Sequence, residues 1–183
     1  LEDKIVNEIH RQLPEKFWSK KGTEGTNPQS PNASMRSIRV QPGLRIELVA
    51  SEPLVIDPVS INFGPEGRTW VVEMHDYPLG LRGGYEPGGR IVLLDDSDRD
   101  GFPDKRTVFL EGLPFPTGVT PWRKGVLVCT APDILYAEDT DGDGVADLRR
   151  TLFSGFATTN YQARVNSLAY GLDGWVHGSN GLI

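Results

Sequence analysis

The sequence predicts an all-β fold, part of a β-propeller, on three observations. An acidic loop of pattern D-x-D-x-D-G-x-x-D occurs twice, at residues 96–104 and 139–147, so the copies start 43 residues apart. A short apolar run enters and another leaves each copy, as in an antiparallel hairpin. A repeat of this length, with about four strands per unit, is the signature of a propeller blade.

Composition and charge favour the same fold class. The 183 residues include 21 Gly and 14 Pro, which indicates many turns and short strands rather than long helices. The net charge is −6 and no long block of Lys and Arg occurs, which argues against a nucleic-acid partner. The single Cys129 lies in an apolar run and is predicted to be a small buried residue.

Two segments are predicted to precede the propeller. Residues 1–18 hold a short amphipathic helix, the end of a preceding segment, because apolar residues share one face over residues 2–13. Residues 19–37 carry hardly any apolar side chain and are predicted to be a disordered linker. The propeller is assigned to residues 38–183 and predicted to be truncated at its C-terminus, because too few blades for a closed ring are present.

The strands are predicted from apolar runs bounded by turns. Alternation over residues 43–50 predicts a half-buried strand entering the domain. The expected strands of the first blade are residues 58–63, 69–74, 90–94 and 106–110; those of the second are 117–122, 126–129, 134–137 and 149–153. Residues 165–170 and 175–178 begin a third blade, out of an expected six.

The acidic loops are predicted calcium sites. Alternating Asp residues direct their carboxylates toward one point, and the Gly residue permits the sharp turn between them. Such a set of hard oxygen ligands suits Ca²⁺. The predicted ligands are Asp96, Asp98, Asp100, Asp104, Asp139, Asp141, Asp143 and Asp147. Flanking strands and the lack of a Glu at position twelve exclude an EF-hand, while a solvated Asp-Gly turn without metal remains the alternative.

Two more clusters are candidates for chemistry. Glu73, His75 and Asp76 lie at the end of the strand predicted at residues 69–74 and can serve in acid-base or ligand work, or form an ordinary polar loop. Residues 160–166 lead into a first strand of a blade, from which a propeller points side chains into its central channel. Gln162, Arg164 and Asn166 are therefore the second cluster, the alternative being ordinary residues at the start of a strand.

The sequence as a set resembles the N-terminal propeller of planctomycete-type membrane-bound dehydrogenases, which are similar to soluble quinoprotein glucose and sorbosone dehydrogenases. The resemblance covers residues 38–183. It is carried by residues 43–53, 57–60, 70–78, 89–95, both acidic loops, 164–168 and 171–175.

This resemblance implies a six-bladed extracytoplasmic propeller, periplasmic or membrane-associated. It implies oxidation of a sugar or alcohol by pyrroloquinoline quinone, with electrons passed to a haem c domain further along the chain or in a partner. Gln162, Arg164 and Asn166 would then bind the cofactor, and His75, Asp76 and Arg164 would be the catalytic candidates. The family's catalytic His has no counterpart in residues 161–164.

Two other functions remain open at the level of sequence. One is a non-enzymatic, calcium-stabilised propeller that binds a polysaccharide or a protein partner. The other is a calcium-dependent propeller hydrolase, such as a lactonase.

Overall fold

The computed structural model describes residues 29–181. The chain divides into two compact units, residues 1–48 and residues 49–183. The helix predicted within residues 1–18 lies outside the described residues.

The described part of the first unit contains one short helix, α2 (Pro31–Ser37). The Ser30 side chain caps it by accepting a hydrogen bond from the backbone N–H of Ala33, and Pro31 occupies the first turn. The prediction of a linker without ordered structure over residues 19–37 is therefore wrong for residues 31–37. A cap and a proline start a helix here although no side chain of the helix is buried.

The strand predicted at residues 43–50 is absent. This segment forms no ladder with any strand that the structure describes, and Leu44 and Ile46 of its supposed inner face are exposed. Alternation of apolar and polar residues marks a face that a partner can cover, but a strand forms only where a neighbour completes its hydrogen bonds.

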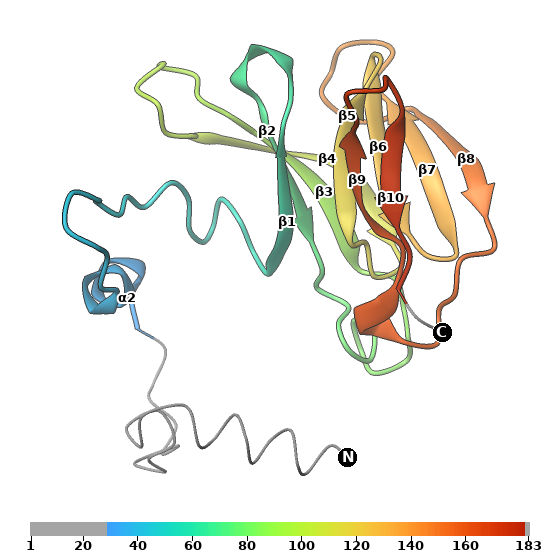
Figure 1. Cartoon of the computed structure of the whole chain (residues 1–183), viewed down its shortest axis with the longest axis horizontal. Helices are drawn as coiled ribbons and strands as arrows, with labels where there is room; N and C mark the ends of the chain where they lie inside the picture. The colour runs from blue at the N-terminus through green and yellow to red at the C-terminus, as the bar shows by residue number, and fades with distance from the viewer. Residues whose placement is uncertain (1–28, 182–183) are drawn as a thin grey trace. The chain divides into compact units, whose positions relative to one another are not determined.

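The second unit is mostly β, as predicted, and its sheets are consistent with propeller blades (Figure 1). The first sheet contains β1 (Pro58–Phe63), β2 (Thr69–Glu73), β3 (Gly89–Asp95) and β4 (Lys105–Leu113). The second contains β5 (Gly118–Trp122), β6 (Gly125–Thr130), β7 (Asp133–Glu138) and β8 (Leu148–Ser154). The third pairs β9 (Asn166–Tyr170) with β10 (Val176–Ser179). Short 3-10 turns lie at η2 (Pro65–Gly67) and η3 (Tyr161–Ala163).

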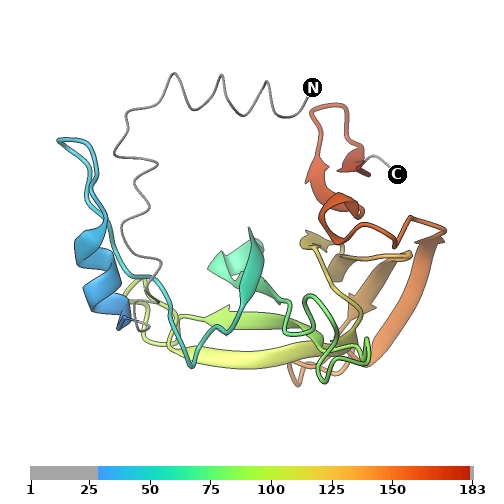
Figure 2. The same ribbon diagram turned by 90° about the horizontal axis from the view of Figure 1, so that it is seen from below.

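Each four-stranded sheet is an antiparallel meander in sequence order, and the first strands of the three sheets are neighbours (Figures 1 and 2). Side chains of one first strand, or of the residue before it, bond to the backbone of the next. The donors and acceptors are Asn62 Nδ2 to Val119 O (3.1 Å), Thr117 Oγ1 to Val165 O (2.6 Å) and Thr120 Oγ1 to Leu168 O (2.8 Å).

The core lies between the first two sheets. It is built from apolar side chains of both, including Val72, Ile91, Leu113, Val126 and Val128, which are fully buried. On the opposite face of the first sheet, Val71, Val92 and Leu94 are buried in a second cluster, so the central strands of this sheet are removed from water on both faces.

Cys129 is fully buried beside Ala131, Ile134 and Val165, where the second sheet meets the third. Burial raises the pKa of its thiol to about 12. The prediction that Cys129 is a small buried residue is therefore confirmed.

The antiparallel order gives the sheets two distinct ends. Both acidic loops, which join β3 to β4 and β7 to β8, lie at the same end as the β1–β2 and β5–β6 turns (Figure 1). We call this the acidic-loop end. The connections β2–β3, β4–β5 and β8–β9 lie at the opposite end, the crossing end. The predicted calcium loops therefore lie at one end of the sheets, and the predicted clusters around Glu73 and Arg164 lie at the other.

Among the described residues, no helix is both long and apolar enough to cross a membrane.

Candidate functional site

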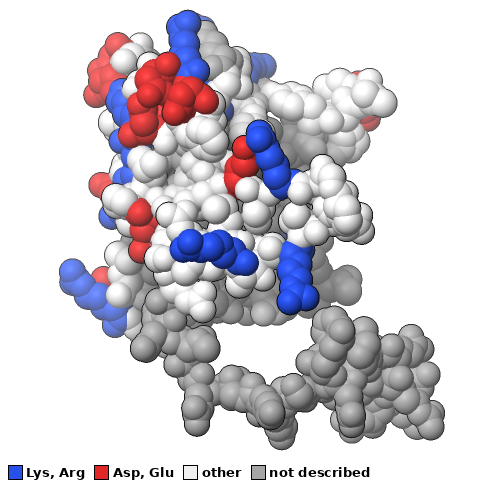
Figure 3. All heavy atoms as spheres, turned by 90° about the vertical axis from the view of Figure 1, so that its left-hand side faces the viewer, with Lys and Arg blue, Asp and Glu red and all other residues white. Residues whose placement is uncertain are grey.

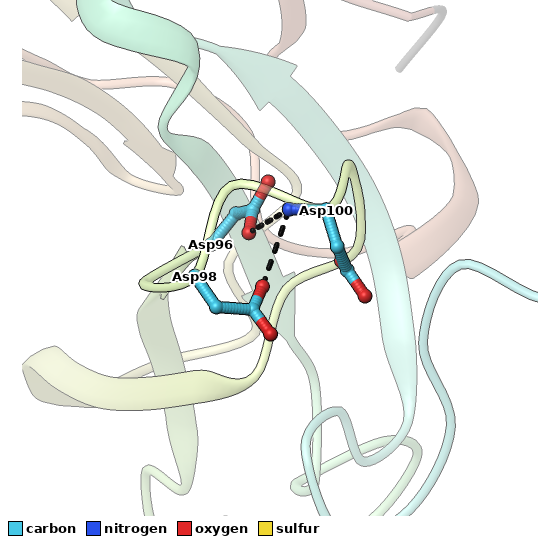
Figure 4. Close-up of side chains that lie close together, drawn as sticks. All are labelled: Asp96, Asp98 and Asp100. Carbon is cyan, nitrogen blue, oxygen red and sulfur yellow. Dashed lines mark hydrogen bonds between the residues drawn. The ribbon is translucent and has the colours of Figure 1, made fainter.

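The first acidic loop folds around its own carboxylates. Asp96 accepts hydrogen bonds from the backbone N–H groups of Asp100 (3.1 Å) and Gly101 (2.8 Å). Asp98 also accepts from the N–H of Asp100, at 3.2 Å, so the two side chains converge inside the loop (Figure 4). Gly101 has φ of 96°, a conformation that costs a glycine little.

The second loop repeats this geometry. Asp139 accepts from the N–H groups of Gly142 (2.7 Å) and Gly144 (2.8 Å), and Asp143 accepts from Val145 (2.8 Å). These backbone donors hold the pKa of Asp139 below its usual value, the N–H of Gly144 most strongly. Asp139 therefore stays ionised well into the acid range.

The fourth Asp of each loop was predicted to be a metal ligand with the other three, but it lies outside their group. Asp104 accepts from the N–H (3.0 Å) and hydroxyl (2.6 Å) of Ser97, and Asp147 accepts from the same groups of Thr140 (3.0 and 2.5 Å). The Ser97 and Thr140 hydroxyls are the main reason that the pKa of each carboxyl is lowered. These two carboxylates close the base of the hairpin and are not members of the converging groups.

The remaining three carboxylates of each loop gather as the sequence predicted. Asp96, Asp98 and Asp100 form one group and Asp139, Asp141 and Asp143 the other, and within each group ligand atoms lie within 4.8 Å of one another. Acidic side chains also gather at one end of the face in Figure 3. Each exposed triad can bind a metal such as calcium, because hard oxygen ligands at this spacing suit a hard cation.

The Glu73 cluster at the crossing end is a closed network. Glu73 is fully buried and accepts hydrogen bonds from Arg106 Nη2 (2.7 Å) and the N–H of Ile56 (2.9 Å). His75 lies between two carboxylates, with Nε2 at 3.1 Å from Glu73 and Nδ1 at 3.4 Å from Asp57. The network joins β2 and β4 to the segment before β1.

Asp76 and Arg164, predicted from separate segments, belong to one buried region. Asp76 is fully buried and its Oδ2 accepts from the N–H groups of Gly88 (3.3 Å) and Phe115 (2.7 Å). The Arg164 guanidinium lies over the rings of Phe115 (4.7 Å) and Tyr161 (4.4 Å) and donates to Thr158 O (2.9 Å). Three connecting loops are thereby fixed to one another.

The surroundings of Arg164 act on the pKa of its guanidinium in opposite directions. Burial lowers the pKa of its guanidinium, while Tyr161 and Asp76 oppose that shift. Within the described residues, Asp76 Oδ1 and Arg164 Nε have no hydrogen-bond partner. Asp76 Oδ2 and Arg164 Nη2 do form hydrogen bonds, and those bonds fix the loops at the crossing end.

Gln162 and Asn166, the other predicted cofactor ligands, do not converge with Arg164. Gln162 is exposed on η3. Asn166 opens instead into a groove of about 270 Å³ along the three first strands, lined also by Thr117, Thr120 and Asn62. The structure thus separates a buried cation from a polar groove.

Sequence reasoning did not identify Arg106 or Phe115. Arg106 lies 33 residues from Glu73, and only the pairing of β2 with β3 and of β3 with β4 brings them together. No local pattern signals this contact. A buried carboxylate needs a paired cation, so the burial of Glu73 would have been the signal to search for one.

No curated protein and no solved structure matches the chain. A family described as a domain of unknown function, DUF7133, matches residues 30–183. The chain belongs to this family, which spans all of the described strands.

Proposed function

We propose that this chain forms part of a calcium-stabilised propeller that binds a polysaccharide or a protein partner. The observation that carries the proposal is the repeated geometry of the acidic loops. Each loop joins the third and fourth strands of its own sheet, and each brings three carboxylates within 4.8 Å of one another. Calcium is the metal assigned because the donor set contains only carboxylate and backbone oxygens.

The state of the predicted acid-base groups supports binding over catalysis. Glu73 and Asp76 are fully buried, and His75 lies between two carboxylates. A general base must come within hydrogen-bond reach of a substrate proton. These side chains are instead engaged in contacts that hold neighbouring segments together.

The calcium assignment is tested by thermal unfolding of the full-length protein in Ca²⁺, Mg²⁺ or chelator. Ca²⁺ at about 100 times its Kd will stabilise the folded state by about 2.7 kcal/mol per site. Asp98→Asn and Asp141→Asn will each remove part of the gain in Tm, and the double variant most of it. Glu111→Gln, the same loss of charge on an exposed side chain of β4, will keep the full gain.

An equal gain in Tm for the parent protein and the double variant would show that calcium acts elsewhere. No gain in the parent protein would leave the loops as metal-free turns. Stabilisation by Mg²⁺ equal to that by Ca²⁺ would overturn the assignment of calcium specifically.

A second function, oxidation of a sugar or alcohol by an extracytoplasmic quinoprotein-dehydrogenase-like propeller that passes electrons to a haem, is favoured by one observation. Asn166, one of the side chains that the resemblance assigns to the cofactor, lines the groove along the first strands. An innermost groove is where a propeller offers polar side chains to a small ligand.

Pyrroloquinoline quinone does not fit the described residues of this groove. The cofactor carries three carboxylates, and buried anions require paired cations. The groove is lined by neutral side chains, and Arg164 lies outside it, packed against two aromatic rings that also contact each other. The described residues of the groove therefore supply no pairing for the carboxylates of the quinone.

The dehydrogenase hypothesis is decided by titrating pyrroloquinoline quinone into the full-length protein with calcium present, and by following dye reduction with sugars and alcohols. Stoichiometric binding and substrate-dependent reduction, both weakened by Asn166→Ala, would establish it. Absence of both would leave the binding propeller as the proposed function.

A further inference from the structure

A third candidate site lies at the acidic-loop end beside the first acidic loop, and none of its lining residues is a predicted metal or cofactor ligand. It is a hollow of about 580 Å³ between the β1–β2 and β5–β6 turns and the end of β9. Its volume is in the range of small-ligand sites. We call it the mouth groove, and six side chains define it: Phe63, Trp122, Tyr170, Arg68, Arg123 and Lys124.

The aromatic side chains occupy equivalent positions. Phe63, Trp122 and Tyr170 are the last residues of β1, β5 and β9, the first strands of the three sheets. Phe63 is 67% exposed and Tyr170 61% exposed, although an isolated aromatic ring gains free energy by burial. Each of the three neighbouring sheets thus contributes one aromatic ring to the mouth groove.

Two of these rings are held in place before any ligand binds. The Tyr170 hydroxyl donates to Pro121 O at 2.7 Å, which fixes the ring across the gap between two sheets. Trp122 contacts Tyr136 edge to face, with centroids 5.4 Å apart, and the Arg123 guanidinium lies 4.2 Å from its ring centroid. Preorganised rings lose little conformational entropy on binding.

The three cationic side chains of the mouth groove, Arg68, Arg123 and Lys124, lie close together although the chain has a net charge of −6. Arg123 and Lys124 form no ion pair with any carboxylate among residues 29–181, and Arg68 makes only a long contact of 3.4 Å with Asp95. Arg123 also has φ of 56° in a two-residue turn, where Gly or Asn is favoured. Such strain is tolerated where a side chain is needed for function.

We propose that the mouth groove binds a saccharide that carries an isolated anionic group, a carboxylate or a sulfate. Pyranose rings stack on exposed aromatic faces, and the anion pairs with Arg123, Lys124 and Arg68. A nucleic acid is disfavoured because its phosphates recur at every residue, while the flanking acidic loops and the net charge repel a polyanion. This inference rests on the proposed function, for which it names the ligand class and the surface.

The test is calorimetric titration of the full-length protein with four probes: cellohexaose carrying a single uronic acid, cellohexaose carrying a single sulfate, unmodified cellohexaose and a single-stranded oligonucleotide. Titrations run with Ca²⁺ present, so that the acidic loops keep the state that the proposed function assigns to them, and again in Mg²⁺. At least one anionic saccharide will bind more tightly than cellohexaose. Comparing the two anionic probes shows whether carboxylate or sulfate is preferred.

Phe63→Ala and Lys124→Gln will each weaken that binding by about tenfold. Two matched controls remove an exposed ring and an exposed charge elsewhere. Phe153→Ala on β8 and Arg82→Gln in the β2–β3 loop will leave the affinity unchanged. Circular dichroism of each variant verifies that the fold is retained.

Saccharide binding that none of the groove variants weakens would overturn this inference and leave the proposed binding function intact. Tighter binding of the oligonucleotide, or of cellohexaose, would overturn the assigned ligand class. If no saccharide binds while calcium still raises Tm through the acidic loops, the mouth groove is not a saccharide site and the partner is a protein.

Discussion

At the scale of single residues, the chemistry of this protein depends on where a charge is buried. Glu73 was predicted as a possible acid-base residue because it lies close in sequence to His75 and Asp76. In the structure it is fully buried and paired with Arg106, whose side chain is 20% exposed. Two charges that leave water together stabilise each other, whereas either one alone is costly.

We expect Glu73→Ala to destabilise the fold by about 3 kcal/mol or more, because it leaves Arg106 without its carboxylate. Urea denaturation of the full-length protein measures this loss. A Glu73→Ala, Arg106→Met double variant should recover part of it, because both charges are then removed. If Glu73→Ala leaves the unfolding midpoint unchanged, the pair contributes nothing to stability.

At the scale of elements, the acidic hairpins are stabilised by hydrogen bonds from their own backbone. The fold lowers the pKa of Asp104, Asp139 and Asp147 from the ordinary value of 3.8. A lowered folded-state pKa contributes stability that is fully present above the unfolded-state pKa. That contribution is lost as pH falls through the folded-state value.

We therefore predict that the hairpins hold their geometry at neutral pH and loosen only below about pH 4. The amides of Gly142 and Gly144, which donate to Asp139, report this directly by NMR. Their chemical shifts should titrate with a midpoint below 3.8, the ordinary value for the carboxyl. Asp139→Asn should abolish the transition, and a midpoint above 3.8 would contradict the assignment.

At the scale of the whole molecule, the described sheets are joined through their first strands. Side-chain donors on β1, on the residue before β5 and within β5 reach backbone carbonyls of the next first strand or of the residue before it. Thr120, which is 3% exposed, donates to Leu168 O at 2.8 Å. A buried donor and acceptor of this kind contribute about 1 kcal/mol when paired.

Thr120→Val should lower the free energy of unfolding by about 1–2 kcal/mol, because the carbonyl of Leu168 loses its donor. Hydrogen exchange should show faster opening of β9 than of β6. Thr151→Val on β8, where the side chain is exposed, is the matched control and should have little effect. Uniform exchange rates in both variants would show that the two sheets are not coupled at this bond.

Local sequence determined the strands, their turns and the acidic triads, because each depends on residues that are close in the chain. Apolar runs bounded by Gly and Pro predicted all ten strands of the three sheets. The Asp spacing predicted four converging carboxylates in each loop; three converge, while Asp104 and Asp147 bond to Ser97 and Thr140 instead. The predictions failed where a partner or a cap decides the outcome. Residues 43–50 lack a neighbouring strand among the described residues, and a capped helix forms at residues 31–37.

Only the tertiary structure decided the roles of the polar clusters. It paired Glu73 with Arg106, packed Arg164 over two aromatic rings and directed Asn166 into a separate groove. It also brought three strand-terminal aromatic residues together at one hollow. Burial and ion pairing depend on residues far apart in the chain, so a sequence pattern fixes which groups are available, and packing fixes which of them remain open to a ligand.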